Sequence, residues 1–213
     1  MSPSDKKEGV IGDNSSAVRG RAGRRPSTSA VALERAAFDL FDERGFEETT
    51  VEDIAAAVGV SKRTFFRYFS SKNDVVWGNF TEQLQAMRAL FGRCPPEQSI
   101  RDAVRSVVVD FNRIDAAQVP WHRKRMQLIL KVPALQAHST LRYQEWSTVV
   151  SEFVADRLGV DARDLVPQVA GHCALGVAVA GYEHWLDHPG EQLTEVLDRA
   201  LRSWASGFAG PAA

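Results

Sequence analysis

Hydrophobic residues recur at intervals of three or four along most of the chain after residue 28, which is the spacing of one helix face. The first such stripe follows a Ser/Thr cap, contains Leu33, Leu40 and Phe41, and ends at Gly45. No stretch alternates between apolar and polar residues as a half-buried strand does, and no internal repeat is evident. The pattern predicts an all-α protein of about nine helices.

The segment from Thr49 to Lys72 predicts two short helices joined by a tight turn. Apolar residues at helical spacing from Ile54 onward form one face of the first helix, and Gly59 ends it where a left-handed backbone is cheapest. Ser61 then caps a second helix, over residues 62–69, with basic side chains outward and phenylalanines inward. This is the helix-turn-helix arrangement, in which the second helix enters the major groove of DNA.

The distribution of charge supports DNA binding, although the net charge of −1 gives no hint of it. From Val60 to Lys72 there are four basic residues and no acidic one, and residues 19–25 add four arginines. Basic residues gathered on one element favour phosphate binding. We predict that residues 1–27 form a disordered tail, whose arginines either order on DNA or stay solvated without a role.

We expect two kinds of DNA contact. The N-terminal end of the second helix meets base edges, and Arg63 is the first choice for base readout because arginine can bond guanine bidentately. Later residues of that helix and the start of the first helix are expected at phosphates. The predicted DNA-binding set is Thr49, Thr50, Ser61, Lys62, Arg63, Thr64, Arg67, Tyr68 and Lys72. One short helix reads few base pairs, so we expect a dimer on double-stranded DNA with a palindromic operator and half-sites about 34 Å apart.

This segment resembles the DNA-binding domain of the TetR family of bacterial regulators. The matching residues are Thr49-Thr50, Ile54-Ala55, Gly59-Val60-Ser61, Thr64-Phe65, Tyr68-Phe69 and Lys72. Two positions depart from the family: Phe66 replaces a tyrosine whose hydroxyl often meets a phosphate, and Arg63 stands where many relatives have glycine. The resemblance implies a ligand-responsive repressor that dimerises through its last two helices.

We divide the chain into the tail, a DNA-binding domain at residues 28–72, and an effector-binding and dimerisation domain at residues 73–213. One helix from Lys72 to Phe91 is expected to join the two domains, until the prolines after Cys94 break it.

The last two helices predict a dimer interface. Residues 167–186 are rich in glycine and alanine, which let helix backbones approach closely, and residues 193–208 carry one apolar stripe. Paired with a second copy, they would form a four-helix interface.

The second domain is rich in aromatic residues, and the basic cluster Trp121–Arg125 precedes an apolar run. A cationic mouth beside an apolar interior suits an effector with an anionic head and an oily tail, such as a long-chain acyl-CoA. An ordinary charged helix face and a solid aromatic core explain the same residues. The candidate effector-binding residues are Trp77, Phe80, Phe111, Trp121, His122, Arg123, Arg125, Met126, Ile129, Tyr143, Trp146 and His172.

Three further segments, Lys72–Phe80, His122–Leu130 and Pro133–Trp146, are similar to a TetR subgroup, the mycofactocin-system transcriptional regulators. This resemblance implies a repressor of the mycofactocin biosynthesis genes, with long-chain acyl-CoA as the effector class.

Other functions find less support. No nucleophile elbow, phosphate loop or zinc-protease motif is present, so we predict no enzyme and no cofactor. His184 and His188 have a metal-binding spacing but sit at a helix end, so we predict no metal site. The longest apolar stretch, residues 173–182, is shorter than the ~20 residues that cross a bilayer, and no signal peptide is evident, so we expect a cytoplasmic protein. A DNA-binding scaffold without an effector and, more remotely, an all-α enzyme using His122 or His172 remain as alternatives.

Overall fold

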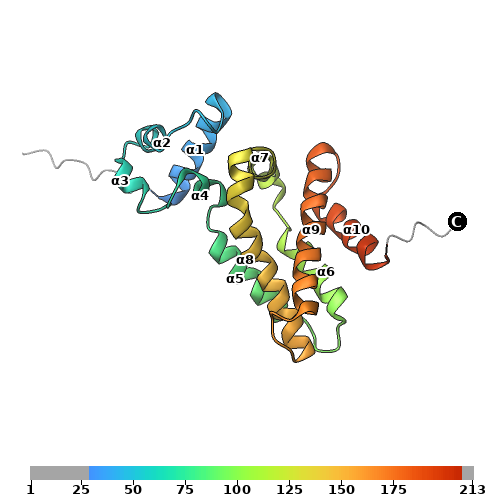
Figure 1. Cartoon of the computed structure of the whole chain (residues 1–213). Coiled ribbons are helices and arrows are strands. Elements are labelled where there is room, and N and C mark those ends of the chain that lie inside the picture. Colours follow the sequence, from blue (N-terminus) through green and yellow to red (C-terminus); the bar gives the residue numbers. More distant parts are fainter. Residues whose placement is uncertain (1–28, 208–213) are drawn as a thin grey trace, which may run out of the picture.

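The computed structural model describes residues 29–207, and in that range the chain is helical with no strand. This confirms the all-α prediction, while the predicted tail lies outside the described residues. Between Ser29 and Gly207 there are ten α-helices and one 3-10 helix, η1: α1 (Ala30–Arg44), α2 (Val51–Ala57), α3 (Lys62–Phe65), α4 (Lys72–Trp77), α5 (Phe80–Phe91), α6 (Ile100–Phe111), η1 (Ala116–Gln118), α7 (Val119–Lys131), α8 (Pro133–Leu158), α9 (Leu165–Asp187) and α10 (Leu193–Ala205). Helices α1 to α4 form a head at one end of a longer bundle, the body, made by α5 to α10 (Figure 1).

The head folds through local signals visible in the sequence. Ser29 caps α1, and Thr50 and Asp53 form a reciprocal capping box at α2. Gly59, at φ 70°, makes the turn into α3, as its left-handed conformation requires. Buried Phe65 secures α3 to the rest of the head.

Helix α3 is shorter than predicted. Its α-helical part is Lys62–Phe65, and the chain then continues in a tighter turn in which Arg67 N donates to Thr64 O and Tyr68 N donates to Phe65 O. The predicted outward and inward faces of residues 62–69 are kept, because Phe65 and Phe69 are buried while the basic side chains Lys62, Arg63 and Arg67 are exposed.

The prediction of a single helix from Lys72 to Phe91 is wrong, because the structure has two helices there, α4 and α5. Gly78, with φ 57° and ψ −138°, separates α4 from α5 and raises the count of α-helices above the predicted nine. A Cβ at this glycine would lie 3.1 Å from Arg125 Nη1 and 3.4 Å from Glu34 Oε2. The break therefore lets the chain bend around a charged pair formed by the head and the body.

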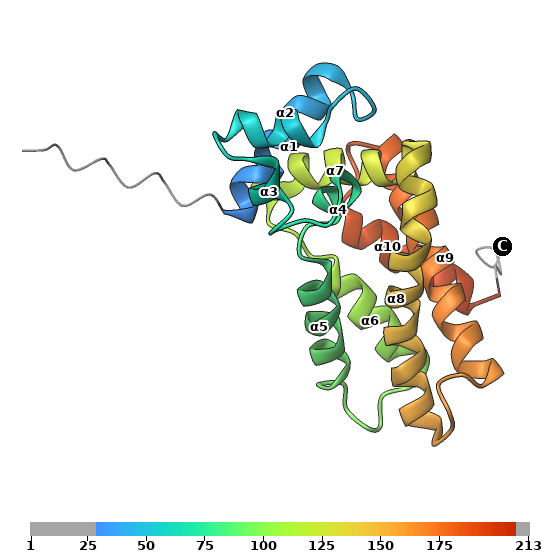
Figure 2. The same ribbon diagram turned by 60° about the vertical axis from the view of Figure 1, so that its left-hand side comes forward.

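The body is built around α8 and α9, which lie side by side, with α10 and α6 against them (Figure 2). A Cβ at Gly171 of α9 would lie 2.5 Å from Ser147 O of α8, so only glycine permits this close approach. Small residues of α9 thus serve packing inside one chain.

Helix α9 also has an exposed apolar face. Leu165, Val166 and Val169 are 78%, 60% and 49% exposed. By length and composition alone α9 could cross a membrane, a result that the count of uninterrupted apolar residues did not anticipate. A helix whose outer face is apolar and whose inner face packs on α8 and α10 is suited to covering by another helix.

Candidate functional site

The start of α3 presents three exposed polar side chains. Ser61 Oγ accepts a hydrogen bond from Thr64 N at 3.2 Å and fixes the helix start. Lys62 Nζ lies 2.5 Å from Glu52 Oε1, and this hydrogen bond holds the pKa of the Glu52 carboxyl below its usual range. Arg63 is exposed and makes no hydrogen bond or ion pair with the residues that the structure describes. Its guanidinium is therefore free to reach a base edge, and the base contact of Arg63 stays a prediction.

The turn that follows α3 presents a second basic and aromatic group. Arg67 lies over the Tyr68 ring, 5.0 Å from its centroid, and donates to the Tyr68 hydroxyl at 3.1 Å. The neighbouring Phe66 ring is 46% exposed, although it is apolar and has no group that water could hydrogen-bond. Together these side chains form an exposed surface next to Arg63 that fits a phosphate backbone.

Two residues of the predicted DNA-binding set bind the protein's own backbone instead. The prediction that they contact phosphates is therefore wrong. Thr49 is fully buried, and its hydroxyl donates to Gly45 O at 2.8 Å and Leu40 O at 3.3 Å. Lys72 Nζ donates to Phe46 O at 2.6 Å, Thr49 O at 2.9 Å and Glu47 O at 3.3 Å. Burial lowers the pKa of Lys72. Both side chains fasten the loop between α1 and α2.

A cavity of about 920 Å³ lies where the head meets the body. Ten of the twelve residues predicted for the effector site line it: Trp77, Phe80, Phe111, Trp121, His122, Arg125, Met126, Ile129, Tyr143 and Trp146. The head contributes Val31, Glu34, Arg35 and Asp39 from α1. The aromatic body is therefore not a solid core, and a ligand in this cavity would touch both parts of the molecule.

The two remaining candidates lie elsewhere, and the prediction of a cationic mouth at Trp121–Arg125 is wrong for two of its three strongly basic residues, Arg123 and Lys124. The Arg123 guanidinium stacks 3.9 Å from the Trp185 ring centroid and donates to Trp185 O at 2.8 Å, so it caps the end of α9. His172 is exposed on α9 and faces Gln168 O. Lys124 pairs with Asp42 on the surface. Of the three basic residues, Arg125 lines the cavity.

One wall of the cavity is a hydrogen-bonded chain that the sequence did not reveal. Tyr182 donates to Asn112 Oδ1 at 2.5 Å, and His122 Nε2 lies 2.9 Å from the Tyr182 hydroxyl. Burial, with a smaller effect of the nearby Arg125 charge, lowers the pKa of His122 to about 4. Burial also raises the pKa of Tyr182. All three side chains are therefore neutral at pH 7 and present a polar but uncharged surface.

Head and body are joined on the cavity side by α1 and α7. Glu34 and Arg125 form an ion pair whose side chains are 18% and 14% exposed. Beside them the Phe38 and Trp121 rings lie 4.4 Å apart between centroids. Glu34, Arg125 and Trp121 all line the cavity, so this connection is part of its wall.

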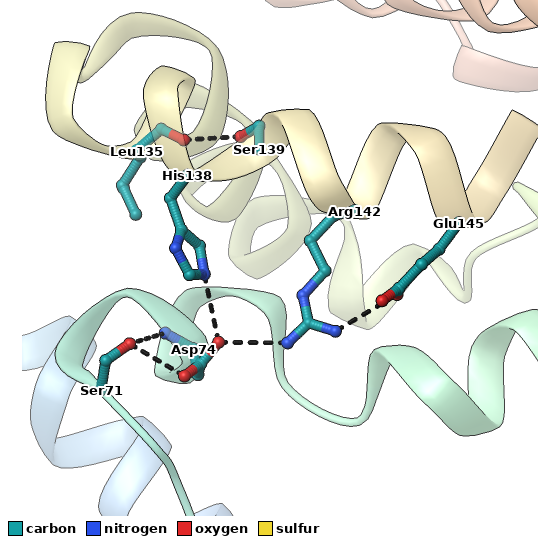
Figure 3. Close-up of polar contacts among 7 residues, drawn as sticks. All are labelled: Ser71, Asp74, Leu135, His138, Ser139, Arg142 and Glu145. Atoms are coloured by element: carbon teal, nitrogen blue, oxygen red, sulfur yellow. Dashed lines mark hydrogen bonds and ion pairs between the residues drawn. The ribbon is translucent and has the colours of Figure 1, made fainter.

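A second connection joins α4 to α8 (Figure 3). Asp74 Oδ1 lies 3.1 Å from both His138 Nε2 and Arg142 Nη2, and Ser71 donates to Oδ2 at 2.8 Å. Burial alone would raise the pKa of Asp74, but the hydrogen bonds from Ser71, Arg142 and His138 outweigh it and lower the pKa. None of these four residues lines the cavity.

The histidines at the end of α9 come together with Glu191. The side-chain atoms of His184, His188 and Glu191 lie within 4.8 Å of one another. Arg199 donates to Glu191 at 2.6 Å and lies 3.3 Å from His184 Nε2. Because the Arg199 guanidinium already supplies the positive charge, this geometry favours an ion-pair cluster.

Comparison with known proteins identifies relatives of both parts. Residues 34–76 match the family described as bacterial regulatory proteins, tetR family, and residues 98–209 match the MftR C-terminal domain. The chain is 41% identical over 188 residues to the putative mycofactocin biosynthesis transcriptional regulator MftR of Mycobacterium tuberculosis, covering 88% of this chain and 95% of that protein.

Two solved structures share the fold. Thermus thermophilus FadR, a TetR-family repressor in complex with lauroyl-CoA, aligns with a TM-score of 0.56 at 23% identity, over 87% of this chain and 97% of that one. SmeT, the repressor of the Stenotrophomonas maltophilia multidrug efflux pump SmeDEF, aligns with a TM-score of 0.58 at 18% identity, over 84% and 90%.

Proposed function

Since the chain belongs to the TetR family of bacterial transcription regulators and carries an MftR C-terminal domain, we propose that it is a cytoplasmic homodimeric repressor of mycofactocin biosynthesis genes, released from DNA by a long-chain acyl-CoA. Family membership makes it a regulator and not an enzyme. The gene target rests on the 41% identity with the M. tuberculosis regulator. The observation that carries the ligand response is the cavity shared by the head and the body.

The head reads DNA through α3. Arg63 enters the major groove and bonds base edges, while Arg67 and Tyr68 hold phosphates on one side. Thr50, which caps α2 from an exposed position, supplies another phosphate contact through the start of α2.

The exposed face of α9 supports a dimer. Leu165, Val166 and Val169 form an apolar strip on the outside of α9, and the small residues Gly176 and Ala180 continue it with exposed positions. Small residues let a second helix approach closely, and covering this strip removes apolar surface from water. Helices α9 and α10 of two copies then form the interface and fix the separation of the two heads.

The cavity suits a large amphipathic effector. Its volume of about 920 Å³ is at the upper end of small-molecule sites. Phe80, Ile129 and Trp146 make a deep apolar interior, while charged side chains of α1 and of the loop after α6, several of them exposed, line another part of the cavity and mark its opening. The FadR of T. thermophilus, which shares this fold, binds lauroyl-CoA. An acyl chain in the interior and its polar head at the opening match this arrangement.

The test is fluorescence anisotropy with a labelled duplex from upstream of the mycofactocin biosynthesis genes, at fixed salt, with a shuffled duplex as control. We expect specific binding that palmitoyl-CoA abolishes and that free CoA and palmitate do not. Failure to prefer this duplex over the shuffled one contradicts the gene target. Specific binding that palmitoyl-CoA leaves unchanged contradicts the effector and favours a regulator without one.

A further inference from the structure

Two buried donors of the cavity wall lack an acceptor. In the part of the chain that the structure describes, Trp77 Nε1 and Arg125 Nε are the buried side-chain nitrogens without a hydrogen-bond partner. Both residues line the cavity. A buried donor left unpaired is costly, so an ordered water or a ligand is expected to provide the acceptor that the protein does not. A ligand that offers acceptor oxygens to this wall would supply it.

Arg125 is also the residue that joins the body to the head. Its guanidinium pairs with Glu34 of α1, lies 5.6 Å from the centroid of the Phe38 ring of α1, and passes close to the bend at Gly78. Its Nε is buried and unpaired while Nη2 pairs with Glu34, so the guanidinium has to turn before a ligand oxygen reaches Nε, and such a turn pulls Nη2 away from Glu34. Binding of such an oxygen and pairing with Glu34 therefore compete.

We propose that an anionic oxygen at the head of the effector replaces Glu34 as the partner of Arg125, and that this exchange is what loosens the head. The inference rests on the proposed function, because it assigns a recognition residue and a mechanism to the same cavity. A carboxylate or a phosphate offers this shared chemistry, the phosphates being those of the CoA part of an acyl-CoA, and Trp77 Nε1 donates a second hydrogen bond to the ligand.

The exchange couples the cavity to the DNA-binding surface, because the head takes one position when Arg125 pairs with Glu34 and another when Arg125 pairs with the ligand. Once Arg125 turns to the ligand, the Glu34 carboxylate loses its partner in a half-buried site and moves toward water, and α1 moves with it. The Asp74 connection to His138 and Arg142 lies outside the cavity and stays, so the head pivots about α4 (Figure 3). The ligand shifts the equilibrium by its differential affinity for the two positions.

A matched control exists on the same two helices. Asp42 of α1 and Lys124 of α7 also form an ion pair, but both side chains are about half exposed and neither lines the cavity. Removing this pair tests whether any head-to-body ion pair has the effect, or whether the one in the cavity wall is special.

The experiment compares the full-length wild type with Glu34→Gln, Arg125→Gln, Trp77→Phe and Asp42→Asn. Affinity for palmitoyl-CoA is measured by quenching of the cavity tryptophans, and operator affinity by anisotropy with and without the ligand. Circular dichroism at the assay temperature confirms that each variant is folded, and palmitate and free CoA show which end of the ligand provides the oxygen.

The Glu34→Gln variant lacks the carboxylate that competes for Arg125, so it should bind palmitoyl-CoA about tenfold more tightly than the wild type. Its ligand-dependent loss of operator affinity should shrink by a similar factor. Arg125→Gln should bind the ligand about tenfold more weakly and respond little, with Trp77→Phe weaker to a smaller degree. Asp42→Asn should match the wild type in both assays.

The inference is overturned if the wild type responds to palmitoyl-CoA and Glu34→Gln and Arg125→Gln respond as it does, or if Asp42→Asn changes the response as much as they do. A wild type that binds operator but ignores palmitoyl-CoA instead contradicts the proposed effector, so the two failures are distinguishable.

Discussion

Replacing Lys72 with methionine separates a structural role from a DNA-binding role. The sequence predicts that Lys72 holds a phosphate, whereas in the structure its ammonium donates to three carbonyls of the loop between α1 and α2. Hydrogen bonds to a charged group contribute about 1.5–3 kcal/mol each when buried. Two of the three are short, at 2.6 and 2.9 Å, but the site is partly open to water, which partly replaces them. We expect Lys72→Met to cost about 2–3 kcal/mol of unfolding free energy.

Thermal and urea unfolding measure this loss, which corresponds to a fall in Tm of roughly 4–12 °C for a chain of this size. Arg67→Met is the matched control, because it removes a basic residue of the same head that lies on the surface. The control should keep its stability and reduce the salt slope of operator binding by about 0.9 for each phosphate lost. Unchanged stability in Lys72→Met, together with a reduced salt slope, would refute the structural role.

Three further predictions concern the DNA contact, the dimer and the neutral wall of the cavity. Arg63→Ala should reduce discrimination at one base pair in each half-site by about 1–3 kcal/mol, measured by competition among single-base operator variants. Val169→Asp, which places a charge on the exposed strip of α9, should give a folded monomer in analytical ultracentrifugation and weak operator binding; a dimer of wild-type affinity would contradict the interface. Because burial lowers the pKa of His122, the free energy of unfolding should depend on pH. Its pKa is about 6.5 unfolded and about 4 folded, so below pH 6.5 the unfolded state binds the extra proton and stability falls until pH 4, by up to about 3 kcal/mol. His122→Gln should remove this part of the pH dependence in urea unfolding at pH 7 and pH 4.5, and an unchanged dependence would contradict burial as its cause.

Much of the cavity could be predicted because the second domain is rich in aromatic residues, which suggested an apolar interior. Phe111, Trp121, Tyr143 and Trp146 were identified in this way, and all four line the cavity. Glu34 was missed, because it belongs to α1 of the head and reaches the cavity only through the docking of the head against α7. Sequence periodicity describes one helix at a time and contains no information about such docking.

The errors have the same physical origin. Thr49, Lys72 and Arg123 were assigned to ligands because their residue types can bind phosphate, but each is used to hold a backbone carbonyl of the protein. The sequence does not reveal the break at Gly78, because a helix tolerates one isolated glycine within an apolar helical pattern. Here the contacts with Arg125 and Glu34 decide, and these come from other parts of the chain.

The central claim, that the cavity and the DNA-binding surface are coupled through the head, is tested most directly by reciprocity. If each bound palmitoyl-CoA lowers operator affinity by some factor, operator DNA must lower the affinity for that palmitoyl-CoA by the same factor. Isothermal titration of palmitoyl-CoA into the wild-type dimer, alone and saturated with operator duplex, measures it. We predict an affinity at least tenfold weaker on DNA, equal in factor to the loss of operator affinity per bound ligand, so that the factors for the two cavities of the dimer multiply to the total loss. Equal affinity for the ligand with and without DNA would contradict the coupling.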